Sequence, residues 1–472
     1  MSGQSRQAIV SQSSAVPLKP LPATAARSGL LEGLAFLRDP GFADRRFAEH
    51  GDVFRTVLFG ESMVFVRGGR AIEDLFAQSD RLSGWWPGSV RQLLGPLSLA
   101  NRTGDAHRAR RRVVGQLFTT AALRRYSPSL IALVDGLAEE LSRNADPAEA
   151  GSREPVALAP LMRRFAFQVI ATTVLGLGPE DRDALFADFQ IWTRGLFAPP
   201  VNLPGGRFRR AQAARVRLLS RLQSILEQAR RAVAAGGPPV SGGLDLLSGG
   251  LDEAGLSLTD DDVVEQLLLL LFAGYETTAS TLSCLMLALL QQPEAAAWLD
   301  EELEGLSWPP QPERALTAYD ASRAPRLDAV VREVMRLTPP VGGFFRRSQE
   351  PIALAGVAVP AGQVIQVSLA ATNQLADGDG DQERSGIIDL DRFRPQRHLE
   401  PGGSGVTLLP FGGGERVCLG KALAELEIRL LAVGVLRRLR FSLAPDQDLS
   451  LEVIPSPTPR DGLRVLVSRR EP

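Results

Sequence analysis

A single long helical pattern constrains the fold of this chain more than any other feature of its sequence. Thr259 can serve as its N-cap, three aspartates follow in the first turn, and the pattern runs to about Gln291 before Pro293. At about 1.5 Å per residue, such a helix crosses a domain from one side to the other. Its most apolar run, residues 267–272, is far shorter than the roughly 20 apolar residues that a bilayer requires. We therefore expect a buried core helix.

The remaining sequence predicts further helices and a few short strands. Apolar residues recur at three- and four-residue spacing between residues 107 and 234, and a Pro- and Gly-rich loop at 199–206 interrupts this helical pattern. We expect a mainly α fold with small β-sheets, in a single domain over residues 30–472 that follows a flexible tail over residues 1–29. Strands are predicted within 53–66, 352–359, 364–369 and 451–467, another helix around 326–337, and loops at 236–243 and 376–386.

Composition narrows the chemistry that the chain can perform. Two cysteines are too few for a disulfide framework or a cysteine-bound iron–sulfur cluster, and three histidines leave few ways to build a multi-histidine metal site. A net charge of -1 gives no reason to expect nucleic acid or an acidic membrane as a partner. The first thirty residues contain no apolar stretch of signal-peptide or transmembrane length, so a cytoplasmic location without a transmembrane anchor is expected.

One glycine-rich loop presents a cysteine at the start of a helix. The segment from Phe411 to Gly420 reads FGGGERVCLG, and residues of high helix propensity follow it. The glycines allow the backbone to approach a flat ligand, and the amides of the helix start favour Cys418 as thiolate, the form that binds metals. A thiolate can donate charge to a haem iron and favour cleavage of the O–O bond. For this loop taken alone, a free cysteine beside a tight turn is the alternative.

This loop resembles the haem-binding loop of the cytochrome P-450 family, F-x-x-G-x-R-x-C-x-G, at every defined position. The resemblance implies that Cys418 is the iron ligand, that Arg416 reaches a haem propionate and that Phe411 packs beside the sulfur, with Gly412 and Gly420 in the same cofactor-binding loop. It also implies haem b as cofactor, O2 as co-substrate and a lipophilic substrate. The matching motifs extend over roughly residues 30–470.

The long helix carries a second motif, AGYETT, at residues 273–278. Ala273 and Thr277 share one face of the helix, and Gly274 costs about 1 kcal/mol relative to alanine, so something needs the space beside it. Dioxygen is the natural candidate. The motif resembles the acid–alcohol segment of the family, which implies that Thr277 orients water and Glu276 feeds protons as the catalytic pair. A polar notch on a buried helix is the alternative.

Two further sets of residues match the family. Glu333 and Arg336 resemble its E-x-x-R pair, which is structural, with Arg392 as the expected third partner, although Leu390 stands where the family usually has proline. For the haem propionates, His107 and Arg111 share a helical face. Arg346 is expected to join them, with Arg347 as its competitor.

Segments around residues 86–107 and 339–346 look like the branch that contains retinoic-acid hydroxylases, which implies an isoprenoid-like substrate. Ordinary core packing is an equally good explanation for each aromatic candidate. By analogy, the substrate pocket would include Trp85, Trp86, Leu93, Phe272, Ala273, Val341, Gly343, Phe344 and Pro457, with Phe189, Trp192 and Phe197 from a mobile lid.

The sequence therefore predicts a haem-thiolate monooxygenase that receives electrons from a separate ferredoxin-type donor and its reductase. Arginines 108, 110 and 112 could form the docking surface for this acidic donor, or simply a solvated face. Two alternatives remain. A peroxygenase, isomerase or dehydratase of the same fold would leave the Glu276–Thr277 pair unexplained, and so would a haem sensor or carrier without turnover.

Overall fold

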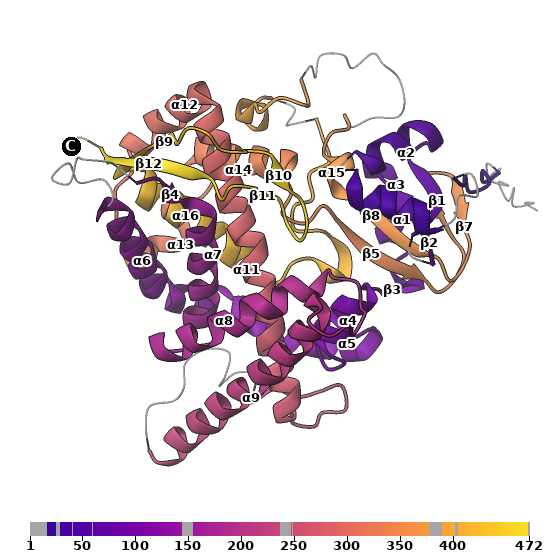
Figure 1. The fold of residues 1–472 in the computed structure, drawn as a ribbon, viewed down its shortest axis with the longest axis horizontal. Helices are drawn as coiled ribbons and strands as arrows, with labels where there is room; N and C mark the ends of the chain where they lie inside the picture. Colours follow the sequence, from indigo (N-terminus) through magenta and orange to yellow (C-terminus); the bar gives the residue numbers. More distant parts are fainter. Residues whose placement is uncertain are drawn as a thin grey trace, which may run out of the picture.

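The computed structural model describes residues 17–24, 29–39, 41–58, 60–143, 154–236, 247, 249–376, 389–401 and 405–470. Most of the predicted tail and nearly all of the predicted loops at 236–243 and 376–386 lie outside these residues. The described part is mainly helical with small sheets, as expected. Figure 1 shows the largest sheet with α1, α2 and α3 on one side of the molecule and the bulk of the helices on the other.

The predicted elements lie close to their expected positions, and the structure adds others that were not predicted, among them the helices before residue 95 and a strand at Leu439–Leu443. The helices are α1 (Gly29–Arg38), α2 (Phe42–His50), α3 (Gly69–Ala77), α4 (Gly88–Leu94), α5 (Gly104–Gly115), α6 (Thr120–Arg143), α7 (Leu158–Val169), α8 (Pro179–Leu196), α9 (Arg207–Ala234), α11 (Asp260–Gln291), α12 (Pro293–Glu304), α13 (Ala315–Ala318), α14 (Pro325–Leu337), α15 (Leu369–Thr372) and α16 (Lys421–Leu436). The strands are β1 (Val53–Leu58), β2 (Glu61–Val66), β3 (Leu82–Gly84), β4 (Val156–Ala157), β5 (Gly343–Ser348), β6 (Ile352–Leu354), β7 (Val357–Val359), β8 (Val364–Ser368), β9 (Leu439–Leu443), β10 (Leu451–Glu452), β11 (Thr458–Pro459) and β12 (Arg464–Arg469).

The predicted long helix is α11, and it runs through the middle of the helical part (Figure 1). The Thr259 hydroxyl oxygen accepts a hydrogen bond from the backbone N–H of Asp262 at 3.2 Å, which confirms the predicted N-cap. By length and hydropathy alone α11 could cross a membrane, but 72% of its most apolar window is buried inside the protein. It is therefore a core helix, packed against α7, α9, α14 and α16.

The largest sheet has five strands in the order β1-β2-β8-β5-β3. Strands β2 and β8 are parallel and the other neighbours are antiparallel. A three-stranded sheet, β4-β12-β9, closes the helical part near the C-terminus. Because β3 and β5 pair, the large sheet brings residues near position 84 beside residues near position 346, more than 250 positions apart in sequence.

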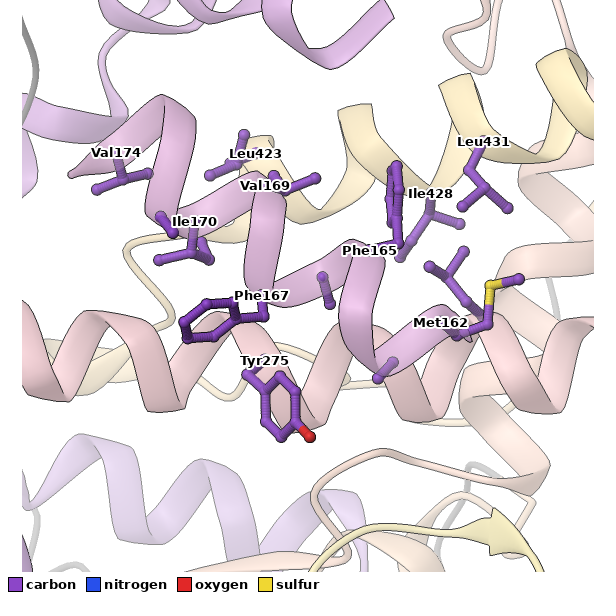
Figure 2. Close-up of a cluster of buried hydrophobic side chains, with 14 of the residues drawn as sticks. Met162, Phe165, Phe167, Val169, Ile170, Val174, Tyr275, Leu423, Ile428 and Leu431 are labelled. Carbon is purple, nitrogen blue, oxygen red and sulfur yellow. The ribbon is translucent and has the colours of Figure 1, made fainter. Parts of the chain in front are cut away.

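Helix α7 lies between α11 and α16 and fills the space between them with apolar side chains. Figure 2 shows Phe165 of α7 beside Ile428 of α16 and Phe167 beside Tyr275 of α11. The Phe167 and Tyr275 rings meet edge-to-face with their centroids 6.4 Å apart. This packing fixes α11, which carries the AGYETT motif, relative to α16, which follows the cysteine loop.

Gly274 of α11 makes room for the turn that follows α7. A Cβ atom at Gly274 would lie 2.4 Å from Cδ1 and Cγ1 of Ile170, whose side chain is 4% exposed. Packing against Ile170 is therefore sufficient to explain this glycine, and dioxygen beside it stays a prediction. The sequence could not show this, because Ile170 is more than 100 residues away.

The Gly274→Ala variant is expected to be less stable than the parent by about 1 kcal/mol. Overpacking against Ile170 costs about 1–3 kcal/mol, and the better helix propensity of alanine returns up to about 1 kcal/mol. Urea unfolding measures the difference. Gly136→Ala in α6 is the matched control, because nothing lies within 4 Å of the added Cβ and the variant should gain stability. A stabilised Gly274→Ala would contradict the packing explanation.

Candidate active site

One stripe of α11 keeps open surface although most of the helix is buried. Ala273 is exposed and Thr277, one turn later, is half-buried, while the flanking Tyr275 and Thr278 are buried. The Thr277 hydroxyl donates a hydrogen bond to the Ala273 carbonyl oxygen at 2.7 Å. A small side chain and a hydroxyl therefore keep accessible surface on one face of α11, as expected for a helix that borders a cofactor or ligand.

The predicted cysteine loop leads into α16 as expected. The backbone N–H of Cys418 donates to the Phe411 carbonyl oxygen at 2.9 Å, and Gly412 and Gly414 adopt φ values of +67° and +64°, which favour glycine. Protein atoms surround the Cys418 thiol on most sides, yet it keeps open surface. Burial raises the pKa of this thiol, while the backbone N–H groups of Gly420 and Lys421 oppose the rise. The same amides would stabilise a thiolate bound to a cation.

Four basic side chains from three segments converge beside this loop. Burial and the charges of Arg416, Arg111 and Arg346 lower the pKa of His107 to about 4. Burial, followed by the charge of Arg416, lowers the pKa of Arg346 to about 10. Among the described residues, none of these three arginines forms an ion pair with a carboxylate. Glu415 is the one described carboxylate whose charge acts on these half-buried arginines, without a direct ion pair. The cluster can therefore accept further anions, and the carboxylates of a bound cofactor would supply them.

Alternation along β5 separates Arg346 from its competitor Arg347. Arg346 lies over the Phe344 ring, with Cζ 4.6 Å from the centroid, and donates to its neighbour's backbone carbonyl at 2.8 Å. Arg347 lies on the opposite face and forms an ion pair with Glu61 at 3.5 Å. Across the β3–β5 pair, Gly84 makes room for Arg416, since a Cβ there would lie 2.6 Å from the Arg416 Cζ.

Glu276 is buried and does not share the open stripe. Its Oε2 lies 3.8 Å from Nε of Arg163, on α7. Burial raises the pKa of Glu276, and the charge of Arg163 lowers it. Burial thus favours the neutral form and Arg163 the charged form, an arrangement suited to a group that takes up and releases protons.

The Glu333–Arg336 pair forms a fully buried ionic cluster, but its third partner is Arg397. Arg336 donates to both Glu333 oxygens, at 2.8 and 2.9 Å, and Arg397 donates to Oε1 at 2.9 Å. His398 Nε2 lies 2.9 Å from Oε2. The expectation for Arg392 was wrong, because its side chain is exposed and pairs with Asp389 at 3.6 Å. Only the Arg392 backbone carbonyl contributes, as a 3.2 Å acceptor for Arg336.

The predicted pocket residues fall into two groups. In a structure without a bound substrate, a side chain that lines an open pocket retains accessible surface, and by this test Leu93 and Pro457 belong to the packed core, as do Phe189 and Trp192 of the predicted lid. The Leu93 carbonyl accepts hydrogen bonds from the Trp192 indole at 3.2 Å and from Arg215 at 2.9 Å. Those with accessible surface are Trp85, Trp86, Phe272, Ala273, Val341, Gly343, Phe344 and Phe197.

Several of these accessible residues are also accounted for by packing. Trp85 meets Phe345 edge-on at 5.3 Å, and Trp86 donates its indole N–H to the Ala100 carbonyl at 3.1 Å. Gly343 permits the β5–β8 pairing, since a Cβ there would lie 2.2 Å from the Val367 carbonyl oxygen. The pocket assignments therefore remain predictions.

A buried polar pair that includes the last residue of the AGYETT motif was not predicted from the sequence. The Thr278 hydroxyl donates to Oε1 of Glu427, on α16, at 2.7 Å, and burial raises the pKa of Glu427 to about 8. The pair joins the helix with the open stripe to the helix that follows the cysteine loop. Glu427 stands between Glu425 and Arg429 in the sequence, so no sequence signal distinguished it from a surface glutamate.

Comparisons with known proteins agree with this geometry. A family model for cytochrome P450 matches residues 41–456. The chain is 35% identical to the "Putative cytochrome P450 120" of Synechocystis sp. over 92% of this chain and 93% of that protein. It is 32% identical to human "Cytochrome P450 26B1" over 91% of this chain and 82% of that protein.

The fold also matches the solved structure described as "Retinoic acid bound cyanobacterial CYP120A1", with a TM-score of 0.82 and 34% identity. The match covers 96% of this chain and 100% of that one. An open cysteine at a helix start, half-buried arginines without a carboxylate ion pair and a small-residue stripe on α11 fit a thiolate-bound haem. The chain belongs to the cytochrome P450 family and is a P450 monooxygenase.

Proposed function

We propose that this monooxygenase binds haem b through Cys418 and inserts one oxygen atom from O2 into a retinoid or another isoprenoid-like lipophile. The observation that carries the substrate class is the likeness, at 34% identity over nearly the whole chain, to a structure described as retinoic-acid bound. When bound, the haem supplies the iron at which O2 is activated, with charge donated by the thiolate.

The geometry of the described side chains supports a role for each remaining residue. Arg416, Arg346 and Arg111, with neutral His107 beside them, would hold the two propionates by charge-assisted hydrogen bonds. Thr277 would hold a water molecule in the open stripe of α11, and Glu276 would pass protons toward it from the Arg163 side.

The proposed electron donor is an acidic, ferredoxin-type protein, and the proposed location is the cytoplasm. Arg108 and Arg112 of α5 are exposed and support a basic docking face near the cysteine loop. Arg110 does not belong to this face, because it is 1% exposed and donates a hydrogen bond to Asp262 at 2.8 Å. Reduction rates that fall with rising salt would support the docking face.

A ligand titration tests the substrate class. We expect all-trans retinoic acid to shift the ferric protein toward high spin in a saturable manner, and the reconstituted enzyme to release a singly oxygenated retinoid. Palmitic acid, a flexible lipophile without the ring, is the comparison ligand. An equal spin-state shift with palmitic acid would broaden the substrate class to general lipophiles. The absence of a shift with retinoic acid would reject the retinoid class.

Arg346→Gln is expected to weaken haem retention about tenfold or more, because a charge-assisted hydrogen bond contributes about 1.5–3 kcal/mol. The measurement is the rate of haem transfer to an excess of apomyoglobin. Arg347→Gln is the matched control, since Arg347 pairs with Glu61 on the opposite face of β5 and should retain haem as the parent does. Faster haem loss from Arg347→Gln than from Arg346→Gln would show instead that Arg347 contacts the propionate.

Thr277→Ala is expected to bind haem and substrate normally but to divert electrons to peroxide. General acid catalysis typically contributes about 100-fold or more, so product formed per NADPH consumed should fall at least about tenfold. Thr281→Ala is the control, since that hydroxyl makes the same kind of bond one turn later, to the Thr277 carbonyl at 3.0 Å, without reaching the stripe. Tight coupling in Thr277→Ala would make Thr277 a packing residue.

A further inference from the structure

One face of α11 holds a short C-terminal segment, residues 456–458, by polar contacts at four-residue spacing. The Ser280 hydroxyl donates to the Pro457 carbonyl oxygen at 2.7 Å, and the Cys284 thiol contacts the same oxygen at 3.5 Å. Glu276 stands one turn before Ser280 and therefore shares this face. The segment is thus docked along the face of α11 that begins with the predicted catalytic acid.

Arg163 of α7 joins Glu276 to this segment. Its Nη2 donates a hydrogen bond to the Thr458 hydroxyl oxygen at 3.3 Å, while its Nε lies 3.8 Å from Oε2 of Glu276. The second distance is too long for a hydrogen bond, so charge alone links the guanidinium to the carboxyl group. The Arg163 guanidinium therefore interacts with two groups at once, the Thr458 hydroxyl of the C-terminal segment and the Glu276 carboxyl group of α11.

The pKa of Glu276 depends on how close the Arg163 guanidinium lies to its carboxyl group. Among the described charged groups, Arg163 is the one that acts on its pKa, against the upward effect of burial. The neighbouring Tyr275 has its pKa raised to about 12 by burial and by Glu276, and Gln190 and Arg194 of α8 act on that phenol. A movement of Arg163 toward or away from Glu276 would therefore change how readily the acid releases its proton.

We propose that Arg163 is a positioning residue that can lie closer to Thr458 or closer to Glu276. Its position would couple the placement of the 456–458 segment to proton supply at α11. A lipophile that shifts this segment would release Arg163 toward Glu276. This regulation rests on the proposed monooxygenase function, but the contact that carries it exists in the protein without ligand.

Two variants distinguish the proposal from a purely structural role, because it predicts shifts of opposite sign. Arg163→Met removes the cation and should raise the titration midpoint of Glu276 by about one pH unit. Thr458→Val removes the competing acceptor, frees the guanidinium to approach Glu276 and should lower the midpoint. The readout is the protonated-carboxyl infrared band of ligand-free ferric holoenzyme, assigned by its loss in Glu276→Gln.

Arg164→Met is the matched control, because Arg164 is the next residue of α7 but pairs with Glu140 of α6. It should leave the Glu276 midpoint unchanged, and Arg163→Lys, which keeps the charge, should stay close to the parent. An unchanged or raised midpoint in Thr458→Val would overturn the proposal, as would a Glu276 band that does not titrate. Since no retinoid is present, a wrong substrate class could not produce either result.

Discussion

Cys418→Ser is expected to lose the strongly red-shifted Soret band of the ferrous-carbonyl complex and to lose turnover by about 100-fold or more. Losing a partner that merely orients a metal ligand already costs about 10–100-fold, and here the ligand itself is removed. The serine hydroxyl has no ionised form near neutral pH that could replace the thiolate as a charge donor. The measurement is the carbonyl difference spectrum of both proteins at equal haem content, followed by turnover with a surrogate donor.

The second cysteine provides the control for this experiment. Cys284 is buried in α11, where its thiol contacts the Pro457 carbonyl and burial raises its pKa to about 11. Cys284→Ser should therefore keep the parent spectrum. A red-shifted band retained in Cys418→Ser would defeat the assignment of the ligand and, with it, the proposed chemistry of the site.

Features that depend on residues close in sequence were predicted well. The N-cap at Thr259, the end of α11 before Pro293 and the helix after the cysteine loop all follow from local propensities and capping. The paired strands around Gly60 follow from a turn signal between apolar runs. The AGYETT motif lies on α11 and the cysteine loop leads into α16, so the centre of the site could be predicted from the sequence.

Features that depend on packing between distant segments were predicted less well. Gly274 is explained by Ile170, and the third partner of Glu333 proved to be Arg397 instead of Arg392, five residues away. A two-residue period separates Arg346 from Arg347 but does not say which side faces the site. Arg163 carries no motif and became visible only through its contacts with α11 and β11.

Glu333→Gln is expected to lower the free energy of unfolding by about 3–5 kcal/mol, the usual cost of breaking a buried ionic cluster by removing one member. The change keeps the shape of the side chain but leaves Arg336 and Arg397, which are 0% and 1% exposed, without their anion. The measurement is chemical unfolding at neutral pH. Glu301→Gln is the control, because its pair with Arg326 is largely exposed and should contribute less than about 1 kcal/mol.

The same substitution should also change how stability depends on pH. Burial alone would raise the pKa of Glu333, but hydrogen bonds from Arg336 and His398 outweigh it and lower the pKa to about 2, from 4.5. A carboxyl group whose folded pKa is depressed stabilises the protein above its unfolded pKa, and this contribution is lost as the pH falls from about 4.5 toward 2. The difference in stability between parent and Glu333→Gln should therefore shrink across that window. A difference that stays constant down to the acid limit would show that Glu333 acts through its shape rather than its charge.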